Sequence, residues 1–147
     1  MNSPLLPDVN VWVALNFDRH AHHVAAKQWY EAVPLSVTLV FCRQTQLGLF
    51  RILTTAAVMG QEVLTQLGCW QIYDRWNQTG QVAWADEPQD LEIRLRALTE
   101  HAASSPKEWM DAYLAAFVET AGIQLVTFDR ALAAKVKGAV LLREPAA

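Results

Sequence analysis

The sequence predicts an α/β fold in which a parallel sheet is covered by helices on both faces. Short apolar runs of strand length alternate with segments of helical periodicity along nearly the whole chain. The strand-like runs are continuously apolar, as is typical of strands that are buried on both faces of a parallel sheet. The 147 residues suit one domain over residues 1–147, and they contain no internal repeat, linker or low-complexity tract.

The first half of the chain is divided by Pro34, which ends a helix, and by Gly60, which breaks another. β-branched and apolar runs mark the strands, whereas apolar residues at helical spacing mark the helices. The expected elements are a strand at 5–9, helices at 10–17 and 22–33, a strand at 36–41, and helices at 44–55 and 61–77.

The second half contains the clearest helix start. Ser105, Pro106 and Glu108 have the spacing of a capping residue, a first helical proline and a capping-box glutamate, and Gly122 marks the end of that helix. The expected elements are a strand at 81–84, helices at 88–103 and 105–121, a strand at 124–128, a helix at 129–135 and a strand at 139–142.

Composition limits the location and the partners. No apolar run approaches the roughly 18 residues of a membrane-spanning helix, and the N-terminus lacks a signal-type segment, so we expect a cytoplasmic protein with no membrane contact. The net charge of −3 gives no general attraction to nucleic acid, so any RNA contact must be local. Such a patch, or simply a solvated face, is formed by Arg130, Lys135, Lys137 and Arg143.

The cysteines and histidines do not indicate a zinc site. Cys42 and Cys69 are isolated, with no CxxC spacing, and we expect both to be small core residues. His20, His22 and His23 cluster near a helix start, where surface histidines are more common than metal ligands.

Three aspartates that are distant in sequence are expected to converge. Asp8 and Asp129 each follow a strand, and the carboxyl ends of parallel strands open on one crevice. Asp111 lies within the late helix, beside the apolar residues Leu114 and Val118, where an ionised carboxylate is costly unless it is paired or bound to a metal. Gathered carboxylates repel one another unless a hard cation lies between them, so the set points to metal-assisted phosphodiester chemistry.

Each aspartate also has a purely structural interpretation. Asp8 and Asp129 stand where helix caps are wanted, and Asp111 would be neutralised by a buried salt bridge to Arg51 or Arg130. Glu108, one turn before Asp111, is explained by the capping box alone. The metal hypothesis therefore depends on the three aspartates together.

Five blocks of sequence together resemble the PIN-domain ribonucleases, and among them the VapC-type toxins of bacterial type II toxin-antitoxin modules. In chain order, the blocks are PDVNVWVAL at 7–15, His22 and His23 with Ala26 and Trp29, TQLGLFRIL at 45–53, MDAYLAAF at 110–117 and LVTFDRAL at 125–132. No block is specific alone, but the set spans nearly the whole chain.

The resemblance implies a three-layer α/β/α fold with a four- or five-stranded parallel sheet. It also implies an endoribonuclease that depends on Mg²⁺ or Mn²⁺, with Asp8, Asp111 and Asp129 as its catalytic and metal-binding residues, and a cognate antitoxin that occupies the groove. One position departs from the pattern. Many PIN nucleases carry a glutamate on the helix after the second strand, but this chain has no acidic residue between Glu31 and Glu62. The stretch offers Thr45, Gln46, Gly48 and Arg51 instead.

We therefore expect a metal-dependent endoribonuclease toxin. Asn10 and Thr45 are candidates for hydrogen bonds to the carboxylates or the phosphate, and Arg51 for a phosphate contact or a pair with a site carboxylate. One alternative is a catalytically silent PIN module that binds RNA or protein. A phosphotransfer domain with Asp8 as nucleophile is a second, although such domains want an acidic residue where Asn10 stands.

The apolar content also predicts self-association. Apolar residues make up 52% of the chain, and it has six tryptophans, which is more apolar surface than one small core readily buries. We expect a homodimer that uses part of this surplus, with Trp12 or the helix around residues 47–53 as candidates.

Overall fold

The computed structural model describes residues 3–144, and its centre is a five-stranded sheet. All neighbouring strands are parallel, in the order β3-β2-β1-β4-β5. The strands are β1 (Leu5–Pro7), β2 (Leu39–Phe41), β3 (Val82–Trp84), β4 (Gln124–Thr127) and β5 (Val140–Leu141). The predicted α/β class is confirmed, and the sheet has the larger of the two expected strand numbers.

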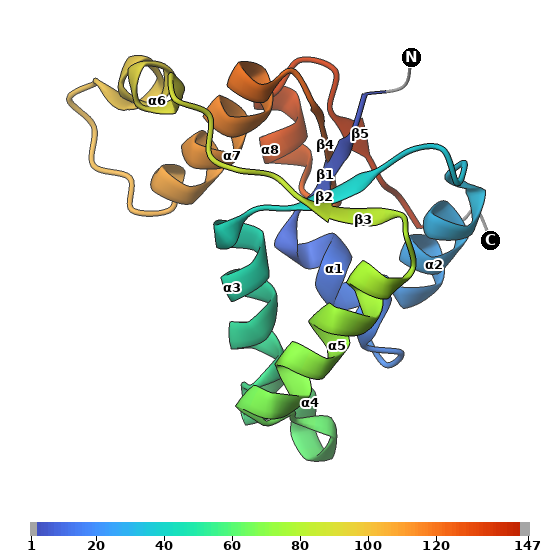
Figure 1. Ribbon diagram of the computed structural model, residues 1–147. Coiled ribbons are helices and arrows are strands. Elements are labelled where there is room, and N and C mark those ends of the chain that lie inside the picture. Colours follow the sequence, from blue (N-terminus) through green and yellow to red (C-terminus); the bar gives the residue numbers. More distant parts are fainter. Residues whose placement is uncertain (1–2, 145–147) are drawn as a thin grey trace.

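The helices form layers on both faces of the sheet, as Figure 1 shows. Those packed on one face are α1 (Val9–Asn16), α2 (His23–Ala32), α3 (Arg43–Leu53) and α5 (Gln66–Gln78). Those on the other face are α6 (Leu91–Thr99), α7 (Glu108–Ala121) and α8 (Arg130–Lys135). The expected three-layer α/β/α architecture is confirmed.

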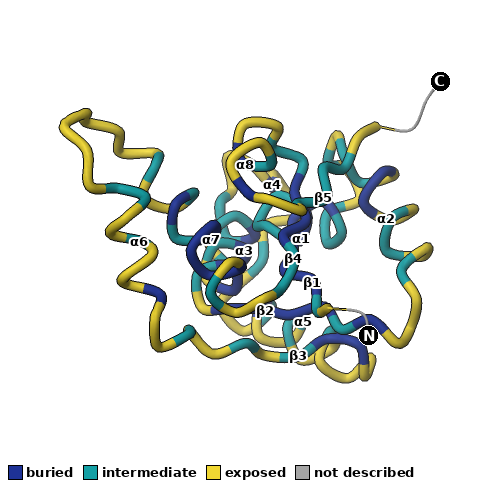
Figure 2. The backbone as a smooth tube through the Cα atoms, turned by 90° about the horizontal axis from the view of Figure 1, so that it is seen from above, coloured by how far each residue is buried: buried dark blue, intermediate teal, exposed yellow. Residues whose placement is uncertain are grey.

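Alternation along the strands divides the core into two clusters. In β1, Leu5 belongs to the cluster under α1 and α3, whereas Leu6 belongs to the cluster under α7. In β4, Val126 and Leu125 are divided in the same way. Successive side chains of a strand point to opposite faces, so each continuously apolar strand supplies both cores. Figure 2 shows mostly buried residues along the inner strands β1, β2 and β4, and exposed residues along most of the connection from α6 to α7.

The strand order fixes where a site can form. The central strand β1 pairs with β2 on one side and β4 on the other, with Pro7 opposite Val126. The connection after β1 leads to β2 on one side, whereas the connection after β3 crosses to β4 on the other side of β1, so the strand order reverses here. Open α/β sheets bind ligands in the crevice beyond the carboxyl ends of the strands at such a point. Asp8 directly follows β1, and Asp129 lies just beyond β4.

Trp12 belongs to the core and is not available for a dimer interface, so that candidate was wrong. Its side chain is fully buried, its ring stacks on Phe41 at 4.0 Å between centroids, and its edge contacts Trp76. Of the second candidate for the dimer interface, the helix around residues 47–53, only part is accessible. Leu49 and Leu53 are fully buried, whereas Leu47 is 53% exposed. The amphipathic pattern of α3 explains this difference, because α3 covers the sheet with only one face.

Three helices begin three or more residues later than the sequence predicted, and one of them, α6, spans Leu91–Thr99 where 88–103 was expected. The helix α7 begins at Glu108 with no side-chain cap, so the predicted capping box at Ser105 was wrong, and Glu108 bonds to the His101 ring instead. The helix expected at 61–77 begins only at Gln66, because the Thr65 hydroxyl accepts a hydrogen bond from the Gly68 amide at 3.0 Å. Upstream of it lie two short elements, α4 (Ala56–Met59) and a 3₁₀ helix at Gly60–Glu62.

Both cysteines are buried and free, as expected. In the described part of the chain, no helix has both the length and the apolar character needed to cross a bilayer.

The close contact of α1 and α3 gives a stability prediction. A Cβ atom added to Gly48 would lie 2.5 Å from Cγ2 of Val9, so Gly48→Ala is expected to lower the free energy of unfolding by about 1–3 kcal/mol. Gly68→Ala is the control, because its Cβ would approach no atom closer than 3.4 Å and alanine favours helix by about 0.5–1 kcal/mol. Urea unfolding measures both variants. Equal stabilities would show that α1 and α3 have room to separate.

Candidate active site

Asp8 is held at the start of α1 by two hydrogen bonds to its carboxylate. Oδ1 accepts from the Val9 amide at 2.7 Å, and Oδ2 accepts from the Thr127 hydroxyl at 2.9 Å. The Asp8 amide donates to the Val126 carbonyl at 2.8 Å, which fixes the residue against β4. Asp8 therefore is the helix cap that the sequence allowed, and the same contacts orient its side chain at the sheet edge.

Thr127 joins Asp8 to Asp129, a role that the sequence reasoning missed. Its fully buried hydroxyl donates to Asp8 and accepts from the Asp129 amide at 3.0 Å. Asp129 in turn caps α8, where its Oδ1 accepts from the Leu132 amide at 3.1 Å. The sequence did contain a signal for this role, because Thr127 is a hydroxyl residue at the last position of a buried strand, just before the candidate Asp129.

Asp111 and Asp8 line one groove of about 910 Å³, which we call the acidic groove. Asp111 reaches it from the first turn of α7, on the opposite side of the sheet from α1. None of the four ion pairs in the described part of the chain involves Asp111, so the predicted alternative of a salt bridge to Arg51 or Arg130 is not formed there. Asp129 does not line the groove, so two of the three expected carboxylates share it.

The three carboxylates still interact electrostatically. Burial raises the pKa of Asp8 above its ordinary value of 3.8, and the negative charges of Asp111 and Asp129 raise it further. The hydrogen bonds from Thr127 and Val9 act in the opposite direction. The net direction is upward, so the ionised form of Asp8 is disfavoured unless positive charge approaches it.

Two arginines supply positive charge to the acidic groove. Arg51, which the sequence proposed for phosphate contact, lines it from α3. Arg43 lines it as well and was missed, although a cation directly after a strand was a signal. Its guanidinium lies 4.5 Å from the Trp84 ring centroid and donates to Oε1 of Gln46 at 2.6 Å. Both arginines are exposed, so they form a local basic rim on the acidic groove.

The other proposed supporting residues make backbone contacts. Thr45 is fully buried, and its hydroxyl bonds to the Cys42 backbone, so it does not reach the carboxylates. Oδ1 of Asn10 accepts from the Phe128 amide at 3.4 Å, which ties α1 to the segment after β4. On the helix where many PIN nucleases carry a glutamate, Gln44 lines the groove instead, with an Oε1 atom that is buried without a partner among the described residues.

Glu87 is a further groove residue that the sequence reasoning missed. It follows β3 and accepts a hydrogen bond from the Tyr113 hydroxyl at 2.9 Å. This bond, together with burial, raises the pKa of Tyr113 far above its usual range, so the phenol remains a donor at all working pH values.

The histidines lie outside the groove, as expected. His22 stacks on Phe128 with 4.4 Å between centroids and pairs with Glu144, and Nδ1 of His23 bonds to the Ala14 carbonyl at 2.7 Å. These contacts give the cluster a structural role beside the Asp129 segment.

The donor set of the groove fits a hard divalent cation. Within residues 3–144, no three His, Cys, Asp or Glu side chains are close enough to ligate one ion directly. Mg²⁺, however, is usually held by one or two carboxylates and keeps several waters. Each oxygen of Asp8 accepts one protein hydrogen bond and retains a free lone pair, and Asp111 faces the same groove. Asp8 and Asp111 are therefore the residues suited to hold the ion.

Comparison with known proteins places the chain in a family. The model of the PIN domain matches residues 5–138. The chain therefore belongs to the PIN-domain family. Its curated relatives include ribonuclease VapC41 of Mycobacterium tuberculosis, 40% identical over 131 residues that cover 86% of this chain and 90% of the relative. Ribonuclease VapC39 of the same organism is 30% identical over 129 residues, covering 87% and 90%. Within the family, the chain stands with the VapC ribonucleases.

Solved structures agree on the fold. VapC20 of Mycobacterium tuberculosis, described as a sarcin-ricin loop cleaving toxin, superimposes with a TM-score of 0.66. The match covers 95% of this chain and 99% of VapC20 at 17% sequence identity. At this identity the likeness shows the common fold alone.

The Thr127 bridge gives the second prediction. Thr127→Val keeps the shape but removes the hydrogen-bond partner of Asp8 Oδ2 and of the Asp129 amide, so the free energy of unfolding should fall by about 1–3 kcal/mol. The pKa of Asp8 should rise further, because a hydrogen bond that lowers it is lost. Urea unfolding and carboxyl NMR titration measure the two effects, with Thr127→Ser as the control that retains the hydroxyl. An unchanged Asp8 titration in the valine variant would contradict the bridge.

The raised pKa of Asp8 gives the third prediction. A carboxyl whose folded-state pKa is raised destabilises the fold above that pKa, and the cost disappears as pH falls below the unfolded value. In EDTA, Asp8→Asn should therefore increase the free energy of unfolding near pH 7.5, and this gain should shrink toward pH 4. Asparagine also caps helices well, so the cap itself is conserved. Added Mg²⁺ should stabilise the wild type and not the variant. If Asp8→Asn is less stable than the wild type at pH 7.5 in EDTA, the ionised Asp8 carboxylate does not destabilise the fold and the prediction is contradicted.

Proposed function

We propose that this protein is a metal-dependent endoribonuclease and the toxin of a type II toxin-antitoxin module. The observation that carries the proposal is the pairing of Asp8 and Asp111 in one open groove beyond the carboxyl end of β1. Its support is the membership in a family whose full-length relatives are named ribonucleases. PIN ribonucleases of the VapC type are metal-dependent as a class, and Mg²⁺ or Mn²⁺ is the ion we assign to this chain.

The mechanism follows from the orientation of the groove residues. When bound, the cation lowers the pKa of a water and neutralises charge that develops at the scissile phosphate. Asp8, fixed by Thr127 and Val9, and Asp111, on helix α7, would hold that ion. Asp129 would bind it directly or through water.

The arginines of the groove orient the phosphate. Arg43 is itself held by Gln46 and the Trp84 ring, so its guanidinium is partly ordered before RNA arrives. Arg51 lies on the same wall of the acidic groove, contributed by α3. A planar guanidinium matches two phosphate oxygens, so both residues suit the transfer of a phosphodiester into the groove.

Apolar surface of the protein indicates where an antitoxin and a second copy of the chain would bind. The acidic groove also has aliphatic walls from Leu47, Ile52, Leu95 and Leu114, which suit the apolar face of a cognate antitoxin segment. Self-association is proposed at the exposed apolar side chains Leu67 and Trp70 near the start of α5, since Trp12 is buried. We place the protein in the cytoplasm, where RNA is available.

The fourth prediction tests catalysis. Asp111→Asn is expected to reduce cleavage of total RNA in Mg²⁺ by about 100-fold or more, because even residues behind a metal ligand typically contribute about 10- to 100-fold. Folding should be retained, since the substitution removes charge and keeps shape. Asp74→Asn is the matched control, because Asp74 is exposed on α5 and lies outside the groove.

Two results would contradict the proposal. Full activity of Asp111→Asn would remove this residue from the mechanism. RNA binding by the wild type with no cleavage in Mg²⁺ or Mn²⁺ would instead support the catalytically silent PIN module.

A further inference from the structure

A second cavity lies beside the acidic groove, between α6 and α7. Its volume is about 470 Å³, within the roughly 300–1,000 Å³ of typical small-molecule sites. We call it the side pocket, and its lining residues are Thr99, His101, Ala103, Ser104, Ser105, Pro106, Glu108 and Trp109. Of these, only Trp109 also lines the acidic groove, so the two cavities meet at this side chain.

Trp109 is unusually exposed for its size. Its side chain is 60% exposed, while Trp12 in the same protein is fully buried. An indole in water loses the burial that normally stabilises it, and exposed aromatic residues beside a cleft frequently bind ligands. Trp109 is also two residues from Asp111 on a rigid helix, so its position relative to the catalytic groove is fixed.

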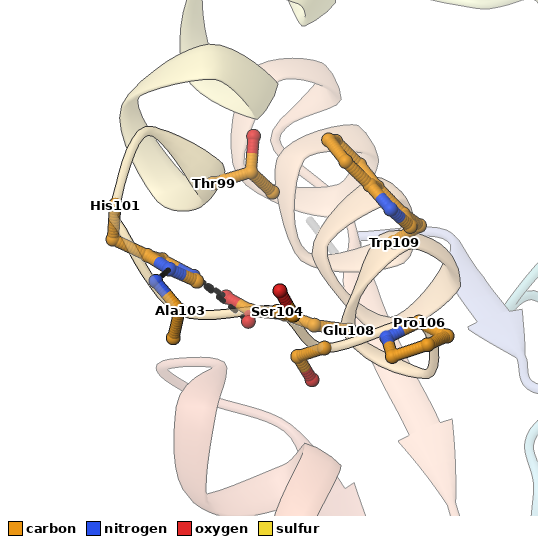
Figure 3. Close-up of a pocket in the computed structure, with 8 residues that line it drawn as sticks. Thr99, His101, Ala103, Ser104, Pro106, Glu108 and Trp109 are labelled. Atoms are coloured by element: carbon orange, nitrogen blue, oxygen red, sulfur yellow. Dashed lines mark hydrogen bonds and ion pairs between the residues drawn. The ribbon is translucent and has the colours of Figure 1, made fainter.

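The wall opposite Trp109 is polar. Nε2 of His101 lies 2.9 Å from both carboxylate oxygens of Glu108, which fixes these two side chains together. Figure 3 shows the indole of Trp109 at one side of the space and the His101–Glu108 pair at the other. The other lining residues are small, some polar and some apolar: Thr99, Ala103, Ser104, Ser105 and Pro106.

We propose that the side pocket takes one unpaired nucleobase of the RNA substrate, stacked on Trp109, when a neighbouring phosphate lies in the acidic groove. The inference rests on the proposed function and adds a specificity site to it. A base offers a flat π-face and a hydrogen-bonding edge, which match an exposed indole and a polar wall. Sequence-specific proteins read unpaired RNA bases in this way, by aromatic stacking and edge contacts. An aliphatic side chain of an antitoxin matches the apolar walls of the acidic groove better than it matches the side pocket.

The base is also a suitable ligand for an acidic protein. Stacking on an aromatic ring contributes affinity without phosphate neutralisation, typically about 1–3 kcal/mol per base. The net charge of −3 makes such a contribution necessary, because only a local basic rim is available for phosphates. The site thus supplies selection among RNA positions that the metal and arginines do not distinguish.

The test begins with the full chain and total RNA as the probe. The ends produced by the wild type are sequenced to find the preferred base near the cut, and an oligoribonucleotide with that site is synthesised. Each flanking nucleotide is then replaced in turn by an abasic one. At one position, the abasic change is expected to lower kcat/KM of the wild type by about 5- to 100-fold. Trp109→Ala should cleave the intact oligonucleotide and this abasic one equally slowly. Trp109→Phe should restore most of the difference in kcat/KM between the two.

Ile93→Ala is the matched control, because Ile93 is another exposed large apolar side chain, on α6, and lies outside both cavities. It should retain the full discrimination of the wild type. Binding to the same oligonucleotides is measured in the Asp111→Asn background, where the same 5- to 100-fold loss should appear for Trp109→Ala. Thermal unfolding checks that the variants fold.

The outcomes separate the two proposals. If the wild type cleaves RNA but Trp109→Ala discriminates the abasic series as the wild type does, the nucleobase site is overturned and the ribonuclease remains. The nucleobase site is also overturned if Trp109→Ala weakens antitoxin binding alone. If the wild type cleaves no RNA in Mg²⁺ or Mn²⁺, the proposed function itself fails.

Discussion

The fixed carboxylate of Asp8 is the constraint on which the rest of the site depends. It is held by the Val9 amide, the Thr127 hydroxyl and the backbone of β4, so it cannot turn away from its neighbours. Burial and the charges of Asp111 and Asp129 make its ionised form costly. A divalent cation would convert this cost into affinity, because the same low-polarity setting would strengthen its attraction to the carboxylate.

The two faces of the sheet contribute different parts of this arrangement. Asp8 and the arginines come from α1 and α3 on one face, whereas Asp111 comes from α7 on the other. The groove therefore exists only if both helix layers are packed correctly on the sheet. Gly48 permits the close approach of α3 to α1, and Thr127 ties the end of β4 to Asp8. Residues with no direct chemical role thus determine the geometry of the carboxylates.

The charge distribution reconciles an acidic protein with an RNA substrate. The groove combines a carboxylate centre with the exposed cations Arg43 and Arg51 at its wall. These cations attract phosphate groups at the groove itself, so association need not depend on the charge of the surface as a whole. The nucleobase site that we propose at Trp109 would add affinity that is independent of charge.

The sequence by itself determined the α/β class, the parallel strands, the burial of both cysteines and the family, because these depend on local apolar periodicity and on short blocks of residues. It also selected Asp8 and Asp111, whose positions follow from strand ends and helix spacing. Only the tertiary structure decided that Thr127 links Asp8 to the Asp129 backbone amide, that Arg43 and Glu87 line the groove, and that Trp12 is buried. These facts depend on which distant side chains meet, and neither periodicity nor capping rules encode such contacts, as the failed capping box at Ser105 illustrates.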